Sequence, residues 1–240
     1  MSAARHQALI AYVGLQTSFA CGRERLATLL WGDTGEANAR HSLSQAILAL
    51  RKKLEPYASG LLIADRSSVR LIESEIWIDV RHFDNLVSIG DPQSLAQAVA
   101  LFKSGFLEGF HAGASDFDNW ADNERSRLWM LYRNAVEQYA ENLSAPPDRV
   151  IEAITRLSAH DQFDESIHRL MLRTLARRFG SSAALAYAEK IKKLLARELE
   201  VEPDPATTAL VADIRATPRM STPEPIIEPA SVLLAQLSHH

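Results

Sequence analysis

Apolar residues between positions 22 and 72 recur first at helical spacing and then in short runs typical of strands. The helical spacing predicts a short helix over residues 22–31 and a longer one over residues 36–55. Two β-prone tetrapeptides follow, LLIA at 61–64 and VRLI at 69–72, and a polar turn at 65–68 separates them. Two helices followed by a hairpin form the layout of a winged helix-turn-helix, so duplex DNA is the first partner to consider.

The longer helix is predicted to have one apolar face and one polar face. Its apolar stripe consists of residues spaced three and four apart: Leu43, Ala46, Ile47, Leu50 and Leu54. The residues that lie largely outside the stripe are Arg40, His41, Ser44, Gln45, Leu48, Arg51 and Lys52. Their guanidinium, amide and hydroxyl groups suit base edges in a major groove, and the basic run Arg51-Lys52-Lys53 suits phosphates. A basic run at a helix end also complements the helix dipole and keeps a surface soluble, so this alternative stays open.

The predicted hairpin has cations and hydroxyls at its tip. Arg66, Ser67 and Ser68 lie in the turn, and Arg70 follows in the second strand. Such a tip beside a recognition helix suits a wing that reaches phosphates or a minor groove. Asp and Ser also favour ordinary solvated turns for local reasons, so the hairpin alone does not decide between the two interpretations.

Composition limits the classes of protein that fit. The chain has 240 residues, a 47% apolar fraction and a net charge of −4, so any nucleic-acid surface must be local. The single cysteine, Cys21, excludes an internal disulfide and a cysteine metal cluster. Neither a signal peptide nor a membrane-spanning stretch is found, so we expect a cytoplasmic protein without membrane contact. No motif implies a metal or a cofactor.

The chain after residue 75 is predicted to be helical. A short extended segment at 77–80 leads into one helix, and Asp91-Pro92 opens the next as N-cap and first-turn residue. A long helix covers about 117–143 and ends before a break at 145–148. Paired helices then follow at about 148–159 and 164–178, and at 181–199 and 204–216. A shared period of 33 residues is close to the tetratricopeptide unit, although a generic helical bundle fits the periodicity as well.

The order of these segments resembles the bacterial transcriptional activator domain family, which includes the streptomycete antibiotic regulatory proteins. The residues that carry the resemblance are Arg23-Glu24-Arg25-Leu26-Ala27, Ala39-Arg40, Leu50-Arg51, Ile78-Asp79-Val80, Gly105-Phe106-Leu107-Glu108-Gly109-Phe110, Trp120 with Glu124-Arg125, His168-Arg169-Leu170-Met171 and Glu202-Pro203. The resemblance implies a winged helix fused to a tetratricopeptide-like domain. It also implies promoter binding as a homodimer and contact with RNA polymerase.

The chain departs from this family at its start. The family's winged helix begins with several short strands, whereas this chain opens in the first helix, at about residues 3–16. Either the chain is a fragment, its start has been set too far downstream, or the domain lacks its supporting sheet. In the last case we expect the underside of the helices and the hairpin edge to be uncovered.

The fold class is therefore predicted as mainly α, with a winged helix that lacks its leading strands before a tetratricopeptide-like domain. We expect the winged-helix domain over residues 1–75, the helical domain over 76–216 and a proline-rich tail over 217–240.

The predicted function is DNA-binding regulation of transcription. Base edges would be contacted by Arg40, Ser44 and Gln45, with His41 beside them, and phosphates by Arg51, Lys52 and Lys53; the wing would be formed by Arg66, Ser67, Ser68 and Arg70. The alternative is a protein-interaction module that has lost DNA binding. An enzyme is not expected: Cys21 precedes a helix, where a thiol pKa can fall, but no base is near it. Trp77, Trp120 and Trp129 are interpreted as core or interface aromatics.

Overall fold

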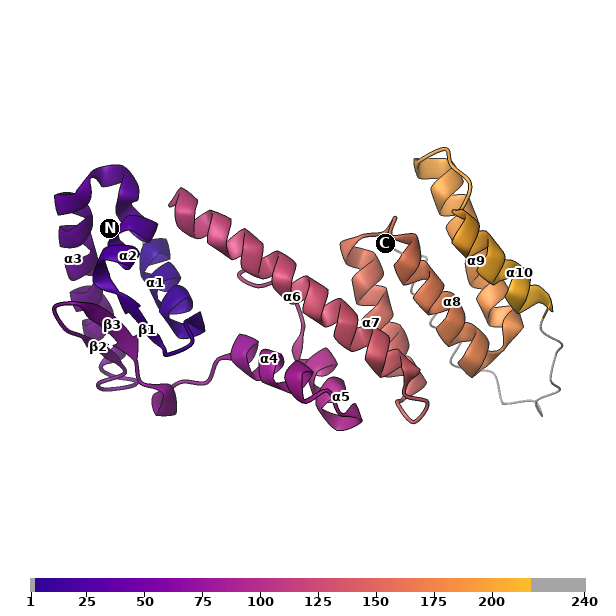
Figure 1. Cartoon of the computed structure of the whole chain (residues 1–240), viewed down its shortest axis with the longest axis horizontal. Coiled ribbons are helices and arrows are strands. Elements are labelled where there is room, and N and C mark those ends of the chain that lie inside the picture. Colours follow the sequence, from indigo (N-terminus) through magenta and orange to yellow (C-terminus); the bar gives the residue numbers. More distant parts are fainter. Residues whose placement is uncertain (1–2, 217–240) are drawn as a thin grey trace. The chain divides into compact units, whose positions relative to one another are not determined.

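The computed structural model describes residues 3–216, which form ten α-helices and one small sheet (Figure 1). This confirms the predicted fold class. The elements in chain order are α1 (Ala3–Leu15), β1 (Ala20–Gly22), α2 (Arg23–Trp31), the 3-10 turn η1 (Gly32–Thr34), α3 (Glu36–Leu54), β2 (Leu62–Ala64), β3 (Ser68–Leu71), the 3-10 turn η2 (Glu73–Glu75), α4 (Asp79–Ile89), α5 (Pro92–Leu101), α6 (Ser115–Glu141), α7 (Pro147–His160), α8 (Glu165–Phe179), α9 (Ser181–Glu198) and α10 (Pro205–Ala216).

The chain divides into two compact units, the first ending at Pro146 and the second beginning at Pro147. The first contains the winged helix together with α4–α6, and the second contains α7–α10. The expected domain boundary near residue 75 stays a prediction. The expected proline-rich tail at 217–240 lies outside the described residues.

The sheet contains a strand that the sequence pattern did not reveal. Its order is β1-β3-β2, and all neighbours are antiparallel. β1 places Cys21 opposite Val69, so β3 has a partner on both sides. This edge of the hairpin is therefore paired, and not uncovered as we expected for a domain without its supporting sheet. Three residues are too few to show an alternating pattern, and only the tertiary pairing reveals the strand.

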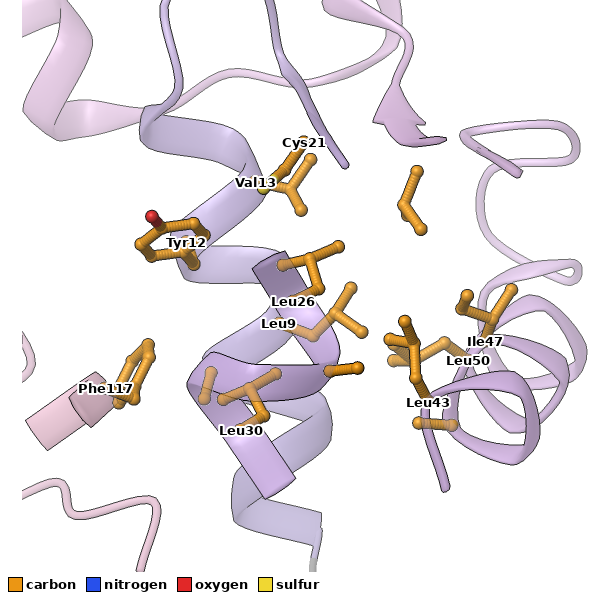
Figure 2. Close-up of a cluster of buried hydrophobic side chains, with 14 of the residues drawn as sticks. Leu9, Tyr12, Val13, Cys21, Leu26, Leu30, Leu43, Ile47, Leu50 and Phe117 are labelled. Carbon is orange, nitrogen blue, oxygen red and sulfur yellow. The ribbon is translucent and has the colours of Figure 1, made fainter. Parts of the chain in front are cut away.

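The underside of the winged helix is also covered. Leu9 of α1, Leu26 of α2 and Leu43 of α3 meet in one buried cluster with the inner side of the sheet (Figure 2). Phe117, in the first turn of α6, approaches the same cluster and has no exposed surface. α6 therefore shares this core and covers part of the apolar face that we expected to be open in a domain without its supporting sheet.

The side chain of Arg125 binds the loop that connects α5 to α6. Arg125 of α6 donates to the carbonyl oxygens of Phe106, Leu107 and Phe110 at 2.9, 2.8 and 3.0 Å. Leu107 has a positive φ of 46°, which is uncommon for a residue with a side chain. Arg125 therefore holds a tight, strained loop between α5 and α6 against the helix that follows it.

The predicted start of α5 is confirmed. Gly90 ends α4 in the left-handed conformation, with φ of 69°, where glycine has no steric cost. The Asp91 carboxylate accepts from the backbone N–H groups of Gln93 and Ser94, and Pro92 occupies the first turn. Three successive residues thus end one helix and begin the next, and the start at Asp91-Pro92 is the part that the sequence alone predicts.

The second unit consists of the predicted helix pairs. Asp164 caps α8, and Arg169 of α8 donates to the Asp204 carboxylate at 2.6 Å, which links α8 to the start of α10. His168 is 2% exposed and lies between the Tyr187 hydroxyl and the Gln162 carbonyl oxygen, each at 2.9 Å. Nε2 must donate to the carbonyl oxygen, and burial lowers the pKa of His168, which favours a neutral ring whose Nδ1 accepts from the tyrosine hydroxyl.

The tryptophans expected in the core or at an interface differ in their exposure. Trp120 packs edge-on against Tyr12, with ring centroids 4.7 Å apart, and Trp129 packs against Phe102 at 5.0 Å. Trp77, in contrast, is 67% exposed, because its neighbours Ile76 and Ile78 take the inward positions of an extended segment. Trp77 therefore does not lie in the core, and its alternative role in an interface stays a prediction.

Within residues 3–216, no helix is long and apolar enough to cross a membrane.

Candidate nucleic-acid interface

The site is built on α3, whose apolar stripe anchors it in the core. Leu43 and Leu50 are 1% and 5% exposed, and the stripe packs mainly against α2. An α-helix turns by about 100° per residue, so positions 41, 45, 48 and 52 lie on the side opposite the stripe. This outer row consists of His41, Gln45, Leu48 and Lys52, all of which are exposed.

The outer row belongs to a face without negative charge. Between Glu36 and Glu55, α3 contains no acidic residue. Residues 36–72 together contain six Lys and Arg against three Asp and Glu, whereas the chain as a whole has a net charge of −4. The segment that carries α3 and the hairpin is thus locally basic, although the protein as a whole is acidic.

Arg40 lies beside this row and is held in ion pairs. Its Nη2 donates to Glu24 of α2 at 3.1 Å and to the carboxylate of Glu36, one turn earlier in α3. All three side chains are exposed. Exposed pairs of this kind contribute about 0–1 kcal/mol, so Arg40 can exchange its carboxylate partners for a phosphate at small cost.

Ser44 contacts Arg23, a residue that the sequence did not indicate as part of the site. Its hydroxyl accepts from Arg23 Nη2 at 2.7 Å and donates to the Arg40 carbonyl oxygen at 2.9 Å. Arg23 is the first residue of α2 and is 21 residues away in sequence. The contact brings a further guanidinium to the candidate surface, and no local sequence signal could have revealed it.

Arg51 has a structural contact in addition to its predicted role. Its Nε donates to the Leu62 carbonyl oxygen at 3.1 Å, and its Nη2 donates to that of Ala64 at 3.3 Å. These bonds tie β2 to the C-terminal half of α3, beside which the hairpin lies (Figure 1). Arg51 therefore positions the wing, whereas Lys52 and Lys53 are exposed on the same turn.

The wing turn is organised by a carboxylate. Asp65 accepts from the backbone N–H groups of Ser67 and Ser68, each at 2.7 Å, and from both serine hydroxyls at 2.9 Å. The two backbone bonds, and then the hydroxyls, hold the Asp65 pKa far below its ordinary value. The serine hydroxyls thus shape the turn, while Arg66 extends from it as an exposed cation.

Arg70 lies on the outer face of the sheet. It is exposed and stands between Ala20 and Ile63 in the register, while its neighbours Val69 and Leu71 are buried. The structure thus places two cations, Arg66 and Arg70, on the hairpin that Arg51 ties to α3.

Cys21 does not have the properties of a nucleophile. It is 7% exposed in β1, and burial raises the pKa of its thiol. Its place before a helix could have lowered the pKa of the thiol, but burial has the larger effect in the opposite direction. Within residues 3–216, no group of three or more His, Cys, Asp or Glu residues could hold a metal ion.

A winged helix followed by paired helices in one chain defines a class of helical transcription regulator. This chain belongs to the bacterial transcriptional activator domain family, whose model matches residues 82–215, more than half of its length. No curated protein matches the chain.

The fold is similar to that of Mycobacterium tuberculosis EmbR, solved in complex with a low affinity phosphopeptide, with a TM-score of 0.64 and 18% sequence identity. The match covers 99% of this chain and 64% of that chain, so it includes the winged helix that the family model leaves out. At this identity the similarity establishes the fold alone.

Proposed function

We propose that the protein regulates transcription by binding promoter DNA through α3 and the β2–β3 hairpin. In this proposal α3 enters the major groove with Gln45 toward base edges, and Lys52 and Lys53 meet the phosphates of the flanking strands. Arg66 and Arg70 of the wing contact the backbone beside the groove. The observation that carries the proposal is the face of α3 opposite the core, which is exposed and free of acidic residues over about five turns.

The contacts of the other candidates support more specific roles for them in this proposal. Arg23 and Arg40 flank the outer row and would contact phosphates after Arg40 leaves Glu24 and Glu36. Ser44 would orient Arg23, and His41 would continue the row toward the start of α3. Ser67 and Ser68 would maintain the turn that presents Arg66.

The helical domain is proposed to contact RNA polymerase or a second copy of the chain. Family membership supports this part, because the matched region at 82–215 is the activator domain itself. A homodimer on repeated half-sites would double the number of phosphate contacts and increase affinity through the linked sites. Sedimentation of the chain with one-site and two-site duplexes measures this stoichiometry.

The DNA-binding proposal is tested by salt-titrated anisotropy with duplexes selected from a random-sequence pool. We expect Lys52→Ala to weaken every duplex and to reduce the slope of log K against log salt by about 0.9. Gln45→Ala should cost about 1–3 kcal/mol at one base position and relax preference there. Lys103→Ala is the matched control, because Lys103 is an exposed lysine of the first unit outside α3 and the wing.

Absence of binding to any duplex would favour the alternative, a protein-interaction module that no longer binds DNA. Equal, salt-independent binding by the Gln45 and Lys52 variants would refute the assigned roles while leaving DNA binding in place.

A further inference from the structure

The outer row of α3 contains one apolar side chain, Leu48, that does not pack in the core. Leu48 is 65% exposed, whereas the stripe residues on the same helix are buried. It lies five residues after Leu43, about 140° around the helix, so it points away from the core. Its neighbours along the row are Gln45, three residues earlier, and Lys52, four residues later.

A single exposed leucine is common on protein surfaces and does not by itself require an explanation. The setting of Leu48 is more specific. It lies at the middle of a face whose other outer-row members are polar or basic, and Ala49 beside it is also exposed. In a major groove, the apolar group available to such a side chain is the C5-methyl of thymine.

We propose that Leu48 reads a thymine by contact with its C5-methyl group. This inference rests on the proposed DNA binding and adds a specificity-determining residue to it. Gln45 would read the adjacent base pair by hydrogen bonds, and Lys52 would fix the helix register through a phosphate. The preferred sequence therefore contains an invariant thymine beside the position that Gln45 reads.

The test uses the full chain and a duplex selected from a random-sequence pool, with each thymine replaced in turn by deoxyuridine. Deoxyuridine pairs as thymine does but lacks the C5-methyl group. Loss of one buried methyl is expected to weaken wild-type binding about fourfold at one position, equivalent to about 0.8 kcal/mol. Leu48→Ala should bind the thymine and deoxyuridine duplexes equally, and should still prefer the base that Gln45 reads.

Met130→Ala is the matched control, because Met130 is 67% exposed on α6, outside the proposed interface. It should retain the full fourfold effect. Because Leu48 is exposed, its replacement should leave helical content and thermal unfolding unchanged, and both are measured first.

Four results would overturn the inference. Wild-type binding that is insensitive to deoxyuridine at every position, or a Leu48→Ala variant that keeps the sensitivity, would refute the methyl contact while the DNA-binding proposal stands. Unchanged DNA binding by Leu48→Ala together with weaker self-association in sedimentation would assign Leu48 to a protein contact instead. Failure of the wild type to bind any duplex would refute the proposed function and this inference together.

Discussion

Arg81 connects α4 to the winged helix, and its replacement is the most informative test of how the first unit is held together. Its Nη1 donates to the carbonyl oxygens of Gln16 at 2.8 Å and Gly14 at 3.3 Å, and its Nη2 donates to that of Thr17 at 3.4 Å. These carbonyls belong to the end of α1 and the loop that follows it. The guanidinium carbon also lies 3.8 Å from the centroid of the Phe19 ring.

This contact supports a strained turn. Phe19 has a positive φ of 52°, yet its carbonyl oxygen accepts from the Leu71 N–H at 2.9 Å and so fixes the entry to β1. A positive φ at such a residue costs about 1–3 kcal/mol unless the surroundings enforce it. Arg81 holds this loop from outside, so α4 stabilises the conformation on which the sheet depends.

The expected cost of Arg81→Ala follows from these contacts. A hydrogen bond from a charged donor contributes about 1.5–3 kcal/mol, and a cation–π contact contributes about 0.5–2 kcal/mol. Two of the three hydrogen bonds are long and the side chain is partly exposed. We therefore expect Arg81→Ala to lower the free energy of unfolding by roughly 2–4 kcal/mol for the three hydrogen bonds and the cation–π contact together. Arg81→Lys keeps the charge but not the forked donor geometry, and should recover only part of the loss.

Urea unfolding followed by tryptophan fluorescence measures this loss in the first unit alone. All four tryptophans, at positions 31, 77, 120 and 129, precede Pro147, so the second unit contributes no tryptophan signal. With a slope of about 2 kcal/mol per molar urea, the midpoint for Arg81→Ala should fall by about 1–2 M. Arg66→Ala, at an exposed arginine of the wing, is the control and should stay within about 0.5 kcal/mol of the wild type. An equally small change for Arg81→Ala would show that α4 does not hold the loop.

Three further measurements test other parts of the structure. Asp91→Ala removes the side-chain cap of α5 and should cost about 1 kcal/mol in the same urea assay, whereas Asp91→Asn should cost less because Asn also caps well. Burial lowers the pKa of His168 from its ordinary value of 6.5. The stability that it contributes to the second unit should therefore be complete above about pH 6.5 and should decrease as the pH falls below it, because the unfolded chain binds the proton more readily. Urea unfolding followed by circular dichroism at pH 7.5 and 5.5 checks this, and a His168→Gln variant with the same pH dependence would contradict it. Cys21, whose thiol pKa is raised by burial, should react with a thiol reagent at pH 7.5 only as fast as the first unit opens, and rapid labelling of the native protein would contradict the buried position.

The local parts of the fold were predictable because their causes are local. The spacing of Leu43, Leu50 and their neighbours defines α3, since a helix repeats every 3.6 residues whatever it packs against. Asp91 and Pro92 mark the start of α5 because a cap needs only residues within one turn. The exposed positions of Gln45 and Lys52 follow from the same periodicity, so the central part of the candidate interface could be found in the sequence.

Contacts between distant residues could not be predicted in this way. Strand β1 exists because Cys21 pairs with Val69, and the core of the winged helix is completed by Phe117, about a hundred residues after Leu9. The partners of the interface arginines are equally non-local: Arg23 reaches Ser44, and Arg51 reaches the carbonyl oxygens of β2. The sequence alone determined which residues are helical and which face of each helix is apolar, because hydrogen bonding and side-chain periodicity act over a few residues. Only the tertiary structure decided which arginines form hydrogen bonds or ion pairs within the fold, and which segments cover the apolar faces of the helices. Both depend on packing between segments that are far apart in the chain.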